Sequence, residues 1–113
     1  MFKNLFTSSA ADPADLDFET FAKAVATGDV TVVDVREPHE FDAGHIRDAV
    51  NLPLSRFDPR DLPAGSKPVV IHCQAGGRSR KALNQAQAAG RHDLKHYPGG
   101  MAQWRMNGGD VTA

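Results

Sequence analysis

The stretch VVIHCQAGGRSRKA, residues 69–82, decides the fold because it joins a strand directly to a helix. Its first residues are β-branched and apolar without alternation, which is typical of a strand covered on both faces of a parallel sheet. Good helix formers then run from Arg78 to Ala89, and Gly90 is the expected helix end. The sequence therefore predicts a strand over 67–73, a tight turn and a helix.

The rest of the chain continues the same alternation. Apolar residues at helical spacing predict a first helix, with Asp17 as its N-cap and Gly28 at its C-terminus. Further strands are expected at 31–35, 49–54 and 94–100, and a closing helix at 101–109. Strands that alternate with helices favour an α/β domain built around a mostly parallel sheet.

Length and composition predict one small domain in a reducing compartment. The chain has 113 residues, of which 41% are apolar, and this is enough for one ordinary core. We interpret residues 1–15 as a flexible arm and residues 16–113 as the domain. The net charge of −1 argues against nucleic acid, and the first residues lack an apolar stretch for a signal peptide or membrane span. With a single cysteine, no internal disulfide is possible, so we expect a cytoplasmic protein.

That cysteine, Cys73, lies at the carboxyl end of the predicted strand, where parallel sheets bind ligands. The pair Gly76 and Gly77 permits a tight turn whose N–H groups point inward and form an anion cradle. The helix N-terminus and Arg78 are expected to lower the pKa of the thiol, so that the nucleophilic thiolate forms at neutral pH. The alternative is an ordinary buried cysteine at a strand end.

Over nearly its whole length the chain resembles the single-domain rhodaneses, a family of sulfurtransferases. Five stretches match in order: TVVDVRE, EFDAGHI, AVNLP, HCQAGGRS and LKHYPGGMAQW. The resemblance implies a five-stranded, mostly parallel sheet flanked by helices, with Cys73 carrying a transferable sulfur atom as a persulfide. The implied anion-binding loop consists of Gln74, Ala75, Gly76, Gly77, Arg78 and Ser79.

One position departs from the family pattern. In GHIRDAVN, members often have a glycine two places after Ile46, and Asp48 stands there instead. Aspartate tolerates turn conformations better than most residues, so we expect an altered turn and an intact site.

The implied activity is thiosulfate:cyanide sulfurtransferase, and it needs neither metal nor cofactor. Cys73 would take sulfur from a small anionic donor, thiosulfate or a persulfide, and pass it to a thiol or to cyanide. A sulfur-relay protein is a further expected partner. The alternatives are a non-catalytic binding or regulatory module and a relative of phosphatases and arsenate reductases. The phosphatase loop is one residue longer than the four residues between Cys73 and Arg78, and this loop also lacks a carboxylic acid.

Arg36 directly follows the predicted strand 31–35 and allows two interpretations. The resemblance implies that it holds the anionic substrate, as in some rhodaneses. Alternatively, it pairs with Asp34 or Glu37 and locks the loop.

Four histidines are candidates for a role at the site or in a metal centre. We expect His45 to be a structural hydrogen-bonder and His72 to face the core, away from the loop. His92 and His96 lie four residues apart in an extended segment, about 13 Å from end to end, which argues against a metal site.

Overall fold

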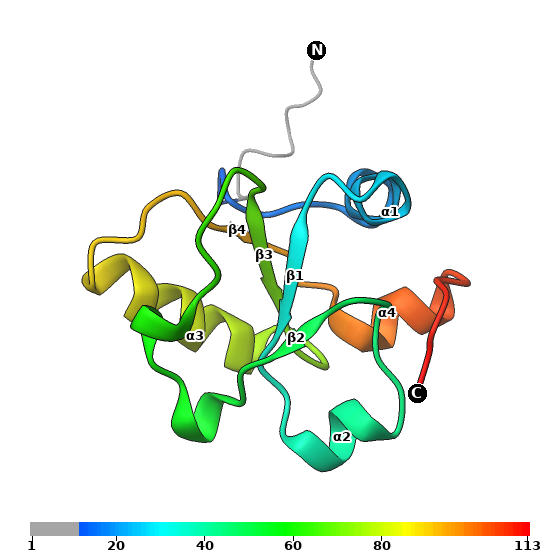
Figure 1. Cartoon of the computed structure of the whole chain (residues 1–113). Helices are drawn as coiled ribbons and strands as arrows, with labels where there is room; N and C mark the ends of the chain where they lie inside the picture. Colours follow the sequence, from blue (N-terminus) through cyan, green and yellow to red (C-terminus); the bar gives the residue numbers. More distant parts are fainter. Residues whose placement is uncertain (1–11) are drawn as a thin grey trace.

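The computed structural model describes residues 12–113 and shows a central parallel sheet flanked by helices (Figure 1). The strand order is β2-β1-β3-β4, and all neighbouring strands run parallel. The strands are β1 (Thr31–Asp34), β2 (Val50–Asn51), β3 (Val69–His72) and β4 (Lys95–His96). The predicted α/β fold with a mostly parallel sheet is therefore confirmed.

Helices cover both faces of the sheet. They are α1 (Phe18–Thr27), α2 (Pro38–Asp42), α3 (Gly77–Ala88) and α4 (Gly100–Met106), with two 3-10 turns, η2 (Leu54–Arg56) and η3 (Pro59–Asp61). Figure 1 shows α3 on one side of the sheet and α1 with α4 on the other. Alternate strand residues point to opposite faces, so Val33 and Ile71 pack toward α3 while Val32 and Val70 pack toward α1 and α4.

The first helix forms where the sequence predicts it. The Asp17 carboxylate accepts a hydrogen bond of 2.9 Å from the Thr20 N–H, and Gly28 ends the helix with φ 71°. On the inner side of α1, Phe21 is fully buried and stacks on Tyr97 with ring centroids 4.4 Å apart. Capping and burial together therefore fix this helix on the sheet.

The expectation of five strands is wrong for the described residues, which contain four. Beside β4, where a fifth strand would lie, only Asp15 pairs, through an isolated parallel bridge to His96. The pairing stays this short because Asp17, two residues later, already caps α1. Residues 1–11 of the expected arm lie outside the described residues, whereas its end is hydrogen-bonded to β4 at Ala14.

Three other details refine the predicted elements. The strand expected at 49–54 is only Val50–Asn51, because Pro53 has no N–H and η2 follows at once. Asp48 has φ 65°, a left-handed conformation that favours glycine and that aspartate tolerates better than most residues. Between residues 12 and 113, no helix has the length and apolar character needed to cross a membrane.

Candidate active site

Cys73 lies just past the end of β3, at the point where the chain turns into α3. Cys73 is 1% exposed, and two backbone N–H groups and one hydroxyl group surround its sulfur. The Gly76 N–H lies 3.1 Å from Sγ, the Ser79 N–H 3.3 Å, and the Ser79 hydroxyl oxygen 3.3 Å. The predicted cradle of N–H groups is therefore present, and it converges on the sulfur atom.

Two glycines permit this loop to close. Gly76 has φ 101°, and a Cβ there would lie 2.7 Å from the carbonyl oxygen of Pro98. Gly100 has φ 64°, and a Cβ there would overlap the carbonyl oxygens of Cys73 and Gln74. Gly77, which begins α3, has nothing within 4 Å of a hypothetical Cβ, so a side chain at this position would meet no steric clash.

The start of α4 holds the loop from behind. The Met101 N–H donates to the Cys73 carbonyl oxygen at 2.9 Å, and the Ala102 N–H donates to that of Gln74 at 3.0 Å. Because these carbonyls are turned toward α4, the following N–H groups of the loop are free to face the sulfur. Gly100, at the start of α4, thus serves the loop directly because it permits this close approach.

The hydrogen bonds around Sγ outweigh the effect of burial on the thiol. Burial raises the pKa of Cys73, but the Ser79 hydroxyl and the N–H groups of Ser79, Gly76 and Ala75 lower it further, so that the net shift is downward. A thiol of lowered pKa forms the nucleophilic thiolate more readily at neutral pH. The site can therefore supply a sulfur nucleophile without a neighbouring metal.

Arg78 lies in the first turn of α3 and is bound to a residue that was not among the candidates from sequence. Its guanidinium donates two hydrogen bonds to Glu40 of α2, at 2.6 and 3.0 Å. These bonds lower the pKa of Glu40 to about 2, and Glu40 also accepts a bond from the Glu37 N–H at 2.9 Å. The Glu40 carboxylate thus partly neutralises the positive charge of Arg78 near Cys73. The only local signal for Glu40 is the capping pattern with Glu37 at the start of α2.

A second set of residues that sequence reasoning missed lies behind Ser79. The Ser79 hydroxyl is 2.7 Å from Nε2 of His96, and Nδ1 of His96 is 3.1 Å from the Asp15 carboxylate. His96 is 1% exposed, and the sequence suggested for it only the role of a metal ligand and argued against that role. No sequence pattern pairs these residues, because Asp15 and His96 are 81 positions apart.

Arg36 pairs with Asp34, as expected if it locks the loop and does not bind substrate. It is 3% exposed, and its guanidinium donates to both carboxylate oxygens of Asp34 and, at 2.8 Å, to the Gly44 carbonyl oxygen. The side chain of Asn51 secures this corner by donating to the carbonyl oxygens of Asp34 and Arg36. Because Nε and Nη2 of Arg36 are bound to Asp34 and Gly44 in the interior, Arg36 supports the loop, and the geometry lends no support to substrate binding.

Two of the histidines occupy their predicted structural places. Nδ1 of His45 lies 2.8 Å from the Phe41 carbonyl oxygen, and its ring stacks on Phe41 with centroids 3.8 Å apart. His72 is fully buried, with Nδ1 3.0 Å from the Cys73 carbonyl oxygen. Both therefore support the backbone around the site.

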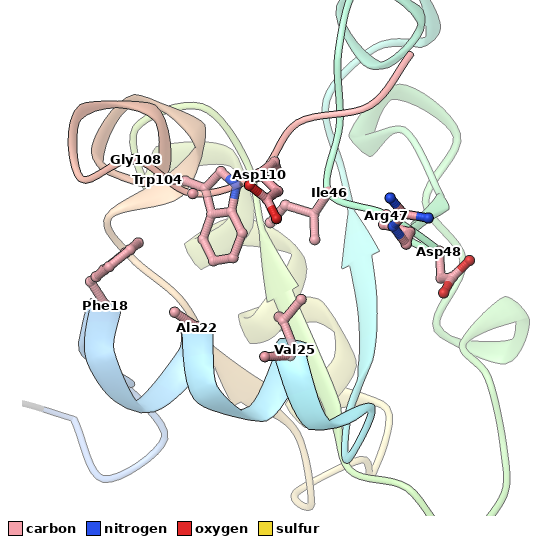
Figure 2. Close-up of a pocket in the computed structure, with 11 residues that line it drawn as sticks. Phe18, Ala22, Val25, Ile46, Arg47, Asp48, Trp104, Gly108 and Asp110 are labelled. Atoms are coloured by element: carbon pink, nitrogen blue, oxygen red, sulfur yellow. Dashed lines mark hydrogen bonds between the residues drawn. The ribbon is translucent and has the colours of Figure 1, made fainter.

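A separate cavity of about 480 Å³ lies between α1, α4 and the turn at Asp48 (Figure 2). Phe18, Ala22 and Trp104 provide apolar walls, and Arg47 lies at its edge. None of its lining residues belongs to the loop that follows Cys73. The cavity and the cysteine site are therefore distinct features of the molecule.

The fold and the site together define a parallel α/β domain with a buried cysteine held by N–H groups at the carboxyl end of an inner strand. This chain belongs to the rhodanese-like family, since the rhodanese-like domain matches residues 17–107. A rhodanese-related protein from Thermoplasma volcanium has a similar structure, with TM-score 0.76 and 27% identity, covering 87% of this chain and 96% of that one.

Two relatives show the range of proteins to which this sequence is similar. The thiosulfate:glutathione sulfurtransferase of Saccharomyces cerevisiae is 31% identical over 109 residues, which cover 82% of this chain and 78% of that protein. An uncharacterized protein of Synechocystis is 48% identical over 80 residues, which cover 70% of this chain and 45% of that protein. The chain therefore spans less than half the length of the Synechocystis relative.

Proposed function

We propose that this protein is a sulfurtransferase that moves a sulfane sulfur from thiosulfate or a related persulfide to a thiophilic acceptor, through a Cys73 persulfide. One observation carries the proposal: the Gly76 and Ser79 N–H groups and the Ser79 hydroxyl all converge on Sγ within 3.3 Å. Such donors stabilise a negative sulfur both as the attacking thiolate and as the persulfide.

The reaction has two half-reactions. In the first, the Cys73 thiolate attacks the outer sulfur of thiosulfate, a new S–S bond forms, and the bond within thiosulfate breaks as sulfite leaves with its electron pair. In the second, an acceptor attacks the outer sulfur of the persulfide, and the Cys73 thiolate is released. Cyanide then becomes thiocyanate, and a thiol becomes a persulfide.

The loop supports each half-reaction in a different way. The N–H groups hold the charge on sulfur in both steps, and Arg78 adds positive charge that Glu40 partly balances. Because this pair is nearly neutral, the N–H groups carry more of the anion binding than the sequence alone led us to expect. Arg36 is assigned to the support of the loop.

The natural sulfur donor and acceptor are expected to resemble the two reactants of the assay, thiosulfate and a thiophilic acceptor. The yeast relative is named for thiosulfate and glutathione, and we extend that pair to this chain: a small anionic sulfur donor and a low-molecular-weight thiol. A sulfur-relay protein is a further proposed partner. The lone cysteine favours a reducing, cytoplasmic setting for the reaction.

A steady-state assay tests the proposal. Purified protein with thiosulfate and cyanide is expected to release thiocyanate with ping-pong kinetics, and Cys73→Ser is expected to abolish the activity. Equal thiocyanate production by Cys73→Ser would reject the proposal. If neither protein is active with thiosulfate or an organic persulfide, the non-catalytic binding module is the better account.

A further inference from the structure

A continuous chain of polar contacts leads from the buried Cys73 thiol to the surface. The Cys73 sulfur is 3.3 Å from the Ser79 hydroxyl oxygen, which is 2.7 Å from Nε2 of His96. Nδ1 of His96 is 3.1 Å from a carboxylate oxygen of Asp15. Cys73 and His96 are 1% exposed and Ser79 is fully buried, whereas the Asp15 side chain is 17% exposed.

The chemistry of these groups fixes the direction of each hydrogen bond. The Asp15 carboxylate only accepts, so Nδ1 of His96 donates to it and Nε2 of the neutral ring is an acceptor. The Ser79 hydroxyl then donates to Nε2, at a shorter distance than the 3.2 Å to its other acceptor, the Gly76 carbonyl oxygen. The Ser79 oxygen is left to accept from the Cys73 thiol, so every proton points from Cys73 toward Asp15.

We propose that Ser79, His96 and Asp15 form a proton relay that accepts the thiol proton when Cys73 becomes a thiolate. The S–H bond of Cys73 breaks and its proton joins the Ser79 oxygen, while the original hydroxyl proton passes to Nε2 of His96. The products are a thiolate that accepts a hydrogen bond from Ser79 and an imidazolium beside the Asp15 carboxylate. No other reactant is needed, and the reverse shift restores the thiol.

The surroundings of the relay suit a proton acceptor. Burial lowers the pKa of His96, whereas the hydrogen bond to Asp15 raises it, so Asp15 is the group that favours a proton on the ring. The charged and titratable groups around it are Asp15 and Asp12 from the N-terminal segment, Arg80 from α3 and the neutral His72 from β3. Arg80 donates to both oxygens of Asp15 at 2.9 Å and holds that carboxylate in place.

At the other end of the relay, the thiol faces a different pair of charges. Arg78 of α3 contributes positive charge and is bound to Glu40 of α2. This pair attracts the thiolate but offers no route for its proton. Ser79 touches the reacting sulfur, whereas His96 acts through Ser79 and is therefore a positioning residue.

The inference depends on the proposed function only in taking Cys73 as the nucleophile, so its test uses no sulfur donor. The rate of Cys73 alkylation by iodoacetamide, measured across the pH range of thiol titration, reports the thiolate fraction. In His96→Gln, the side-chain amide can still accept from Ser79 but cannot take up a proton. We expect its thiol pKa to rise by about one unit or more, with alkylation about tenfold slower at neutral pH.

Two further variants complete the experiment. His92→Gln changes an exposed histidine of the same segment and is expected to leave the profile unchanged. Asp15→Asn removes the carboxylate at the exposed end, and we expect a smaller shift in the same direction; this variant decides the question if His96→Gln fails to fold.

A profile for His96→Gln identical to that of the parent, or displaced to lower pH, would overturn the relay. Thiocyanate production tests the sulfurtransferase separately. An unchanged alkylation profile in an active enzyme therefore rejects the relay alone, and a shifted profile in an inactive protein rejects the proposed function alone.

Discussion

Gly76 is the residue on which the geometry around Cys73 depends most directly. It combines φ 101° with a hypothetical Cβ position 2.7 Å from the Pro98 carbonyl oxygen, and its N–H donates to Sγ. We expect Gly76→Ala to lower the free energy of unfolding by about 1–3 kcal/mol and to slow Cys73 alkylation. Urea denaturation measures the first effect and iodoacetamide the second.

Gly90→Ala is the matched control for this prediction. Gly90 has φ 97°, but a methyl group at this position would have nothing within 4 Å, so the change adds backbone strain without a clash. If the two variants lose the same stability and both alkylate at the parent rate, the contact with Pro98 has no role in shaping the loop.

Arg36 offers a choice between binding and support that kinetics can resolve. Arg36→Gln leaves the fully buried Asp34 carboxylate without its main partner, and we expect a loss of about 3–5 kcal/mol in stability. The KM for thiosulfate should stay unchanged in the folded fraction, because the guanidinium is bound in the interior. A raised KM at near-parent stability would instead assign Arg36 to the substrate.

Single residues also show what the sequence could predict at the site. Cys73, its Gly-rich loop and the turn at Asp48 follow from local patterns, because neighbouring residues set them. His96 and Glu40 could not be predicted, because their partners are distant in sequence: 38 positions separate Glu40 from Arg78. Only the folded sheet brings such pairs together.

Among the elements, α2 and α3 are joined by the Glu40 to Arg78 pair close to the thiol. Glu40→Gln removes a negative charge and leaves the Arg78 charge unbalanced, so we expect the thiol pKa to fall. Alkylation below that pKa should become faster by about fivefold or less, since partly exposed charge interactions are worth about 1 kcal/mol or less. Iodoacetamide kinetics measure this.

Asp58→Asn provides the control for Glu40→Gln, because it breaks a similar exposed pair with Arg60 away from the loop. It should leave the alkylation rate unchanged. Slower alkylation in Glu40→Gln would show that Glu40 positions Arg78 for the thiolate rather than competing with it.

The same pair has a defined pH dependence. The pKa of Glu40 falls from its usual 4.5 to about 2 in the folded protein, first because of the hydrogen bonds from Arg78. A lowered carboxyl pKa stabilises the fold above the usual value, and the contribution disappears as the pH falls toward 2. We expect the small stability gap between the parent and Glu40→Gln to close over this interval, as measured by urea denaturation. A gap that persists at the acid end would exclude ionisation of Glu40 as its source.

The elements themselves were predicted to different degrees. Strands β1 and β3 and helices α1 and α3 have strong local patterns and appear close to the expected positions. The short strands β2 and β4 depend on pairing with their neighbours, so their lengths, and the limit of four strands within residues 12–113, could not be predicted from the residues alone. Asp15 completes the edge of the sheet through a single bridge.

Across the whole molecule, the sheet separates two apolar clusters, and only one of them contains Cys73. The cluster under α1 and α4 is built on Phe21, whose ring centroid lies 4.4 Å from that of Tyr97 and 5.5 Å from that of Trp104. We expect Phe21→Ala to lower the free energy of unfolding by about 3–5 kcal/mol. Alkylation of Cys73 in the folded fraction should keep the parent rate, because the Cys73 side chain belongs to the cluster on the opposite face of the sheet and Met101 holds the loop through its backbone N–H.

Met106→Ala is the control for Phe21→Ala, since Met106 is 84% exposed and should tolerate the change. A marked change in the thiol pKa of folded Phe21→Ala would contradict the separation of the two clusters.

The most direct test of the sulfurtransferase proposal is an intact-mass spectrum of the purified protein after incubation with thiosulfate, then after addition of cyanide, beside Cys73→Ser. The account predicts a gain of one sulfur atom that cyanide removes with release of thiocyanate, and no gain in the variant. Sulfur addition to Cys73→Ser, or thiocyanate release without any sulfur adduct on the parent protein, would contradict a Cys73 persulfide.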